Sequence, residues 1–142
     1  MAEYASAIEI EADPEDVFDY LVTNEGMTAW MGQYAALDPV VGGAFAVNIA
    51  GYAIRGEYLE IDRPRRVAFS WGMAGSQDLP PGTSKVTFTL SPTEKGTRVE
   101  LVHSDLPETE VPGHQSGWTH FLPRLRLAAH GHVLGPDDWS PN

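Results

Sequence analysis

The stretch from residue 97 to residue 129, TRVELVHSDLPETEVPGHQSGWTHFLPRLRLAA, decides the fold of this chain. Its first part, Thr97 to Ser104, alternates apolar and polar residues, which predicts a β-strand with one buried face. Its last part, Gln115 to Ala129, repeats apolar residues with a helical period, which predicts one amphipathic helix. Pro123 removes one backbone hydrogen bond from that helix, so we expect a kink there or a helix that begins only near residue 120.

Four runs upstream of this stretch also have the character of strands, at residues 44–50, 53–61, 66–71 and 85–90. Short turns and no helix separate them, so they are expected to form an antiparallel meander that ends with the strand at residues 97–104. The N-terminal segment Ser6 to Glu11 alternates as a strand too. Asp13 and Pro14 then begin a helix, and a short second helix is predicted around residues 26–31.

The phase of the alternation assigns the inner face of this sheet. On the strand at residues 97–104, His103 shares its phase with Val99 and Leu101, so its side chain is predicted to face the long helix. The other inward positions are Phe45, Val47, Ile49, Val67, Phe69, Trp71, Val86, Phe88 and Leu90. We therefore expect one α+β domain over residues 1–134, followed by an irregular tail at residues 135–142.

Composition limits the classes of partner. The chain has 142 residues, 42% of them hydrophobic, which suffices for one core. Its 20 acidic residues outnumber 9 basic ones, and a net charge of -11 repels phosphate backbones, so nucleic acid is excluded as a partner. Cysteine is absent, and the sequence begins without the pattern of a signal peptide, so a cytoplasmic location without membrane insertion is expected.

Six short motifs occur in an order that is typical of a known family. They are ADPEDVF at 12–18, WM at 30–31, DPVVGGAF at 38–45, GEYLEI at 56–61, FSW at 69–71 and GW at 117–118. Together they resemble the Hsp90-ATPase-activator-homologue (AHSA1-like) family of the START-like, polyketide-cyclase-like (SRPBCC) superfamily, over residues 6–129. The resemblance implies a helix-grip fold of the START/Bet v1 type, in which a long C-terminal helix lies on a curved antiparallel sheet beside two short helices.

The resemblance also implies a site. Members of this superfamily hold a cavity between the long helix and the sheet, so we expect a hydrophobic or aromatic small molecule to bind there. Aromatic and flexible apolar side chains suit the wall of such a cavity. The candidate ligand-binding residues are Trp30, Met31, Trp71, Phe88, His103, Trp118 and Leu122. The alternative is that these side chains fill a packed core, and only a void in the structure separates the two.

His103 is the strongest candidate for a polar group in that site, because an inward imidazole can accept a proton or bind a ligand. The alternative is a core histidine whose hydrogen bonds are satisfied internally. Two further functions stay open beside ligand binding: a cyclase- or dehydratase-like enzyme that uses His103, and a protein-interaction role such as that of an Hsp90 co-chaperone or a homodimer. A binding protein is favoured over an enzyme, and no catalytic residue or cofactor is assigned.

Two other clusters of residues could carry a function. The five histidines lack the spacing of a metal site, since His114 and His120 fall on different faces of any helix, and no metal ligand is assigned. Arg63, Arg65 and Arg66 form a basic cluster that is predicted to be a solvated turn. The alternative for this cluster is a site for an acidic partner or a ligand carboxylate.

Overall fold

The computed structural model describes residues 2–137 and 139. Within them, seven strands form one antiparallel sheet in the order β1-β7-β6-β5-β4-β3-β2. The strands are β1 (Ala2–Ile10), β2 (Tyr34–Leu37), β3 (Ala44–Ile49), β4 (Tyr52–Asp62), β5 (Arg66–Met73), β6 (Ser84–Pro92) and β7 (Thr97–Leu106). The helices are α1 (Pro14–Val22), α2 (Asn24–Thr28) and α3 (Val111–Ala129), the last preceded by the short 3-10 helix η1 (Glu108–Glu110).

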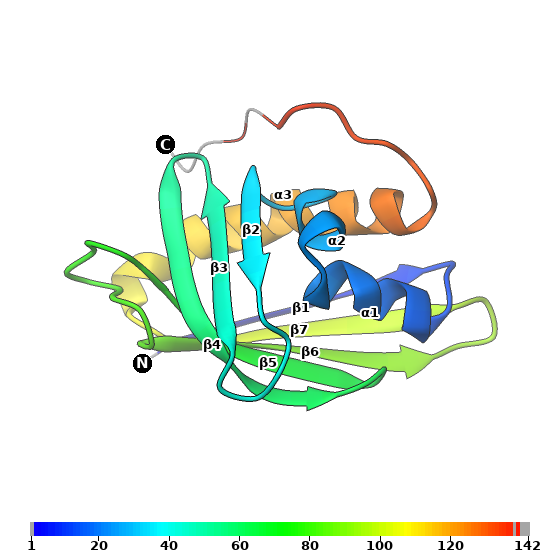
Figure 1. The fold of residues 1–142 in the computed structure, drawn as a ribbon, viewed down its shortest axis with the longest axis horizontal. Coiled ribbons are helices and arrows are strands. Elements are labelled where there is room, and N and C mark those ends of the chain that lie inside the picture. The colour runs from blue at the N-terminus through cyan, green and yellow to red at the C-terminus, as the bar shows by residue number, and fades with distance from the viewer. Residues whose placement is uncertain (1, 138, 140–142) are drawn as a thin grey trace.

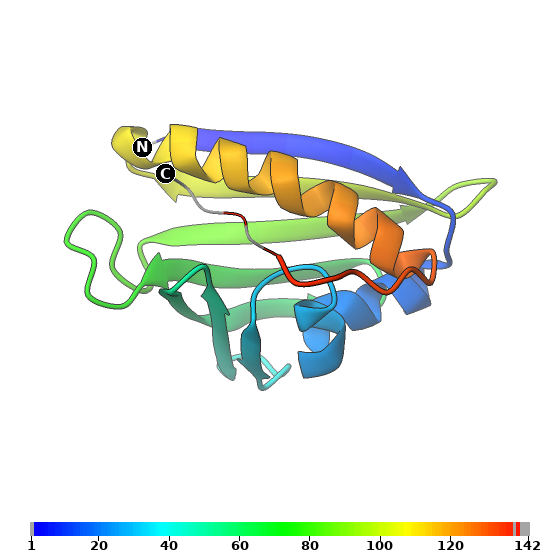
Figure 2. The same ribbon diagram turned by 90° about the horizontal axis from the view of Figure 1, so that it is seen from above.

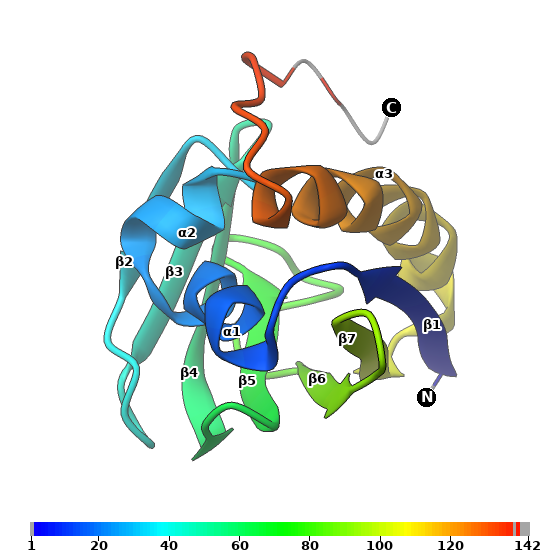
Figure 3. The same ribbon diagram turned by 90° about the vertical axis from the view of Figure 1, so that its right-hand side faces the viewer.

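The sheet is a curved trough, and α3 lies across its concave face (Figure 1). The helices α1 and α2 cover the trough beside the C-terminal end of α3 (Figure 3). Neighbours in the meander are consecutive in sequence, and β1 pairs with β7 to complete the sheet. This arrangement confirms the predicted α+β helix-grip fold, with two short helices and a long C-terminal helix.

The inner face carries the core, as the alternation of the strands predicts. Every inward position named above is buried, including His103. The rings of Phe45 and Phe69 stack at 3.9 Å between centroids with an angle of 11° between their planes. The hydroxyl of the buried Tyr58 donates a hydrogen bond of 3.2 Å to the carbonyl of Leu21, which ties β4 to α1. Burial raises the pKa of this phenol far above its ordinary value.

The last helix differs from the prediction at both of its prolines. It begins at Val111, four residues earlier than expected, because Pro112 lies in the first turn, where backbone N–H groups need no helical partner. Pro123 lies inside one continuous helix, with its ring exposed on the outer side. The helix therefore starts neither at residue 115 nor near residue 120.

Two further details of the sheet were not predicted. The edge strand β2 was missed because its four residues, YAAL, alternate only weakly. The register between β4 and β5 shifts between Tyr58 and Glu60. A side chain at Gly56 would overlap the carbonyl of Ser70, so close approach of two strands is the reason for glycine there.

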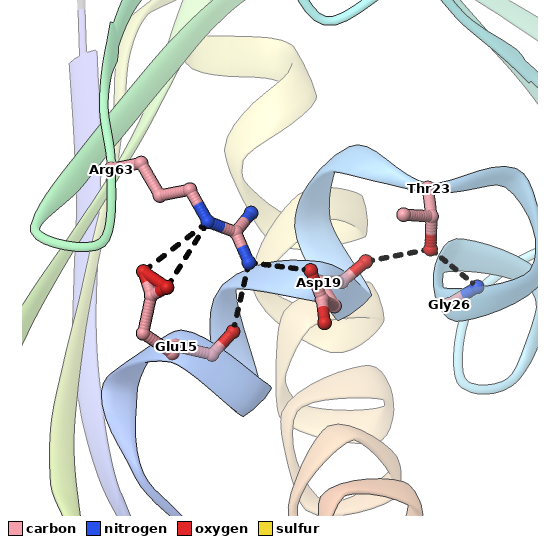
Figure 4. Close-up of polar contacts among 5 residues, drawn as sticks. All are labelled: Glu15, Asp19, Thr23, Gly26 and Arg63. Carbon is pink, nitrogen blue, oxygen red and sulfur yellow. Dashed lines mark hydrogen bonds and ion pairs between the residues drawn. The ribbon is translucent and has the colours of Figure 1, made fainter.

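One arginine of the basic cluster, Arg63, links the β4–β5 turn to α1, and these contacts are called the Arg63 clamp. Arg63 forms ion pairs with Asp19, at 2.6 Å, and with Glu15, at 3.2 Å (Figure 4). Its guanidinium lies 5.1 Å from the ring centroid of Phe18. These contacts, the hydrogen bond to Asp19 foremost, raise the pKa of Arg63. Its neighbours are paired as well, Arg65 with Asp62 and Arg66 with Glu60. The alternative of a site for an acidic partner is therefore unsupported, since each arginine already contacts a carboxylate of its own chain.

Asp19, which pairs with Arg63, also contacts the residue that links α1 to α2. Thr23 ends α1 and caps α2, because its hydroxyl donates to the carbonyl of Asp19 at 2.8 Å and accepts from the N–H of Gly26 at 3.0 Å (Figure 4). One threonine thus fixes the angle between the two short helices.

Candidate functional site

A cavity of about 310 Å³ lies between the N-terminal half of α3 and the strands β3 to β5. Apolar side chains form most of its wall, as is usual for sites that bind small molecules. The sheet contributes Ile49, Tyr52, Ile54, Trp71 and Met73. The other lining residues are Met31, which follows α2, Glu110, Gly113, His114, Gly117, Trp118 and Phe121 around α3, and Trp139 in the C-terminal tail. Side chains therefore do not fill all of the space between α3 and the sheet.

Two glycines leave space for this cavity. Gly113 and Gly117 are four residues apart, so they lie one above the other on the same face of α3. A Cβ at Gly113 would meet no atom within 4 Å, and a Cβ at Gly117 would contact only the ring of Trp139, at 3.4 Å. Glycine in a helix costs about 1 kcal/mol relative to alanine, so the hollow face is kept at the expense of helix stability.

Three hydrogen bonds hold the C-terminal half of α3 against the rest of the protein. Arg124 Nε donates to the carbonyl of Trp30 at 3.1 Å, and Arg126 Nε donates to the carbonyl of Glu9 at 3.0 Å. The carbonyl of Ala128 accepts from the Tyr20 hydroxyl at 2.9 Å. The helix is thus held against β1 and the segment around α1 and α2 at one end, while its glycine-containing end covers the cavity.

Behind the cavity wall, a chain of hydrogen bonds runs through His103. Trp118 Nε1 lies 3.0 Å from His103 Nδ1, His103 Nε2 lies 2.9 Å from Ser84 Oγ, and Ser84 Oγ lies 2.8 Å from the carbonyl of Trp71. An indole N–H can only donate, so Nδ1 accepts and the imidazole proton is on Nε2. Ser84 then accepts from His103 and donates to Trp71. The tautomer of His103 follows from its partners.

This arrangement leaves no nitrogen of His103 free. The residue is fully buried, and burial, assisted by the neighbouring His114, lowers its pKa to about 2. A general base needs an available lone pair and a pKa near the working pH. Acid–base catalysis by His103, an alternative drawn from the sequence, therefore has no atom to act through. The position matches the other alternative, a core histidine with satisfied hydrogen bonds.

A second indole–imidazole pair lies at the cavity itself. Trp71 Nε1 donates to His114 Nε2 at 3.2 Å, which leaves the proton on Nδ1, and Nδ1 donates to the carbonyl of Glu110 at 2.8 Å. Burial lowers the pKa of His114. The rings of His103 and His114 are 5.0 Å apart between centroids and almost perpendicular. Both imidazoles are consequently held neutral, each by the indole of a cavity-lining tryptophan.

The C-terminal tail covers part of the cavity. After α3, residues 130–137 turn back along the helix toward its N-terminal half (Figure 2). His120 Nε2 lies 2.9 Å from Asp137 Oδ1, and this pair fastens the tail to α3. Trp139 then stacks on His120, with 17° between the ring planes, and packs edge-on against Phe121. Its indole forms one wall of the cavity.

The structure brings together only part of the candidate set. Met31, Trp71 and Trp118 line the cavity. The other four candidates, Trp30, Phe88, His103 and Leu122, are buried but are not lining residues. Trp30, for example, donates to the carbonyl of Tyr20 at 3.0 Å and packs edge-on against Phe88.

Several lining residues were not candidates in the sequence. Gly113, His114 and Gly117 were overlooked, although glycines four residues apart in an amphipathic helix are a detectable signal. Trp139 lies in the tail that was expected to be irregular, and nothing in its local sequence shows where the tail returns. Residues 138 and 140–142 of the predicted irregular tail lie outside the described residues.

Among residues 2–137 and 139, no group of three or more His, Asp or Glu side chains is placed to hold a metal ion. Over these residues, no helix is both long enough and apolar enough to cross a membrane.

Known proteins share this fold and sequence. A family model described as Activator of Hsp90 ATPase homolog 1-like protein matches residues 11–129. Among solved structures, an AHSA1-like protein from Rhizobium etli is 35% identical, with a TM-score of 0.76 over 98% of this chain and 88% of that chain. The Aha1 dimer from Colwellia psychrerythraea is 25% identical, with a TM-score of 0.77 over 91% of this chain and 96% of that chain.

An HSP90 activator from Plasmodium falciparum shares the fold at 24% identity, with a TM-score of 0.76 over 90% of this chain and 96% of that chain. The comparison with curated proteins finds no match. The family model covers most of the chain, from the end of β1 to the end of α3. The chain therefore belongs to the family of Activator of Hsp90 ATPase homolog 1-like proteins.

Proposed function

We propose that this protein binds an apolar or aromatic small molecule in the cavity under α3 and releases it chemically unchanged. The observation that carries the proposal is the hollow face of α3, where Gly113 and Gly117 keep a void open against aromatic walls. A core that served stability alone would gain from side chains at these positions. The neutral, fully engaged His103 supports binding over catalysis.

The first experiment replaces a lining residue of the cavity by a larger one. Gly113 lines the cavity, and a Cβ there would meet no atom within 4 Å, so the side chain of Gly113→Leu has space beside the cavity and the free protein should fold. Isothermal titration of tryptophol, a neutral indole alcohol, should give saturable binding to the wild-type chain and at least tenfold weaker binding to Gly113→Leu. Tryptophol recovered afterwards should have an unchanged mass.

The matched control is Ser116→Leu, which adds the same side chain to an exposed position of α3 that is not a lining residue. This variant should bind tryptophol as the wild-type chain does. Equal binding by the wild-type chain and Gly113→Leu would place the ligand elsewhere, and absence of binding to the wild-type chain would contradict the proposal.

A second candidate is interaction with Hsp90, which family membership and the Plasmodium falciparum relative favour. It predicts that the purified chain raises the ATPase rate of an added Hsp90. A homodimer, as in the Colwellia psychrerythraea structure, is the corresponding candidate for self-association. Light scattering of the purified chain separates the monomer from the dimer.

A further inference from the structure

The cavity has few polar groups. Besides its apolar walls, the cavity has three lining residues with polar side chains: Tyr52, Glu110 and His114. His114 has no hydrogen-bonding atom to spare, because Nε2 accepts from Trp71 and Nδ1 donates to the Glu110 carbonyl. The side-chain acceptors that remain for a ligand are the carboxylate of Glu110 and the hydroxyl of Tyr52.

The Glu110 carboxylate lines the cavity, and among the described residues no lysine or arginine forms an ion pair with it. Its Oε1 lies 3.9 Å from Nδ1 of the cavity-lining His114, whose proton is directed to the backbone carbonyl of Glu110. The side chain of Glu110 is 23% exposed, so it is partly withdrawn from water. None of the lining residues in the described part of the chain is a lysine or an arginine. A ligand carboxylate would therefore meet like charge and no cationic partner.

The net charge and the aromatic walls also favour a cationic ligand over an anionic one. The net charge of -11 gives a field that attracts cations and repels anions. The aromatic walls add to it, because the faces of Trp71, Trp118 and Trp139 attract a cation where they border the cavity. Charge, hydrogen-bonding capacity and ring chemistry therefore all favour the same ligand class.

We infer that the cavity selects a cationic amphiphile, an aromatic or apolar body that ends in a protonated amine, with the Glu110 carboxylate as its counter-ion. The inference rests on the proposed function, because it concerns the ligand of the same cavity. The aromatic body lies among the tryptophans that line the cavity. The ammonium group donates to Glu110, and the Tyr52 hydroxyl is the second polar contact within the cavity.

Three probes with one indole body and different ends test this choice: tryptamine carries an amine, tryptophol a hydroxyl and indolepropionic acid a carboxylate. Titration calorimetry at neutral pH should give tryptamine a Kd about tenfold lower than tryptophol, the effect of one hydrogen bond between charged groups. Indolepropionic acid should bind more weakly than tryptophol. In Glu110→Gln, the Kd values of tryptamine and tryptophol should become equal within about twofold.

Glu108→Gln is the matched control, because it removes the same charge from an exposed position of η1 that is not a lining residue. It should keep the tenfold preference for tryptamine, whereas loss of the preference in this variant would assign the effect to net charge and overturn the role of Glu110. Tryptophol binding as tightly as tryptamine to the wild-type chain, or indolepropionic acid binding tightest, would overturn the inference and leave the proposed function standing. If none of the three probes binds, both fail.

Discussion

The indole Nε1 of Trp118 donates a 3.0 Å hydrogen bond to Nδ1 of His103, and this contact removes the only lone pair through which the buried imidazole could take a proton. The same tryptophan lines the cavity. His103 therefore acts on the cavity indirectly, as a positioning residue that fixes the plane of the Trp118 ring. Trp71 and His114 form a second indole–imidazole pair one turn earlier in α3. In this pair the imidazole is on the helix and the indole is on β5.

This geometry predicts how stability depends on pH. The pKa of His103 is about 2 in the folded chain, against an ordinary value of about 6.5 when the chain unfolds. Above about pH 6.5 the imidazole is neutral in both states. Below it, the unfolded chain binds a proton that the folded chain does not. The free energy of unfolding should therefore fall by about 1.4 kcal/mol per pH unit from this group as the pH decreases.

Burial lowers the pKa of His114 in the same direction, which steepens the slope. Urea unfolding between about pH 7 and pH 5 measures it. Nitrogen-detected NMR is the second readout, since the His103 ring should keep the signature of the neutral Nε2–H tautomer across this range. A ring that titrates near its ordinary pKa would show that the hydrogen-bond chain is wrong.

Removal of the indole donor should destabilise the protein without emptying the site. In Trp118→Phe, the aromatic body stays while Nδ1 of His103 loses its partner in the core. A buried polar atom left without a partner costs about 1–3 kcal/mol, and the free energy of unfolding should fall by that amount. Trp71→Phe is the comparison. It also removes an indole donor, but its acceptor, His114, is closer to solvent, so the free energy of unfolding should fall by less than in Trp118→Phe. Equal losses in the two variants would contradict the assigned difference in burial.

The tail should control access to the cavity. Trp139→Ala removes the wall that stacks on His120 and packs on Phe121, so the dissociation rate of a bound aromatic ligand should rise several-fold while stability changes little. Stopped-flow displacement measures that rate. Val133→Ala, in the same tail but 99% exposed, is the control and should leave the rate unchanged. An unchanged rate in Trp139→Ala would mean that ligands enter by another route.

The Arg63 clamp should contribute modestly to stability. Its side chain is 40% exposed, and ion pairs at the surface are worth about 0–1 kcal/mol each, so Arg63→Ala should lower the free energy of unfolding by about 1 kcal/mol. Arg65→Ala removes a single, more exposed pair and should have almost no effect. Added salt should narrow the difference between the two variants. A salt-independent loss in Arg63→Ala would assign the effect to its packing on Phe18 instead.

The fold was predictable because its signals are local. Alternation in Val86, Phe88 and Leu90 shows which face of a strand is buried, and the period from Trp118 to Ala128 indicates a helix that covers that face. The burial of His103 followed from its phase alone. The strand β2 escaped because two central alanines carry almost no signal, and the start of α3 escaped because Pro112 and Gly113 are poor helix formers within a helix.

The site was less predictable because it depends on absences and on contacts between distant residues. The void is created by Gly113 and Gly117, which leave no apolar pattern. Trp139 reaches the cavity only because residues 130–137 fold back along α3, a path that no local rule specifies. The hydrogen-bond partners of His103 come from β6 and α3, so its lack of a free nitrogen could be recognised only in three dimensions.

One NMR experiment distinguishes a binding cavity from an unused void. Tryptophol is titrated into the uniformly nitrogen-labelled chain, and the indole N–H resonances of its four tryptophans are followed. Binding under α3 predicts saturable shifts for Trp71, Trp118 and Trp139, with the buried Trp30 nearly unmoved. Shifts confined to surface amides would contradict ligand binding in this cavity. The absence of any shift in the indole N–H resonances of the lining tryptophans would contradict it as well.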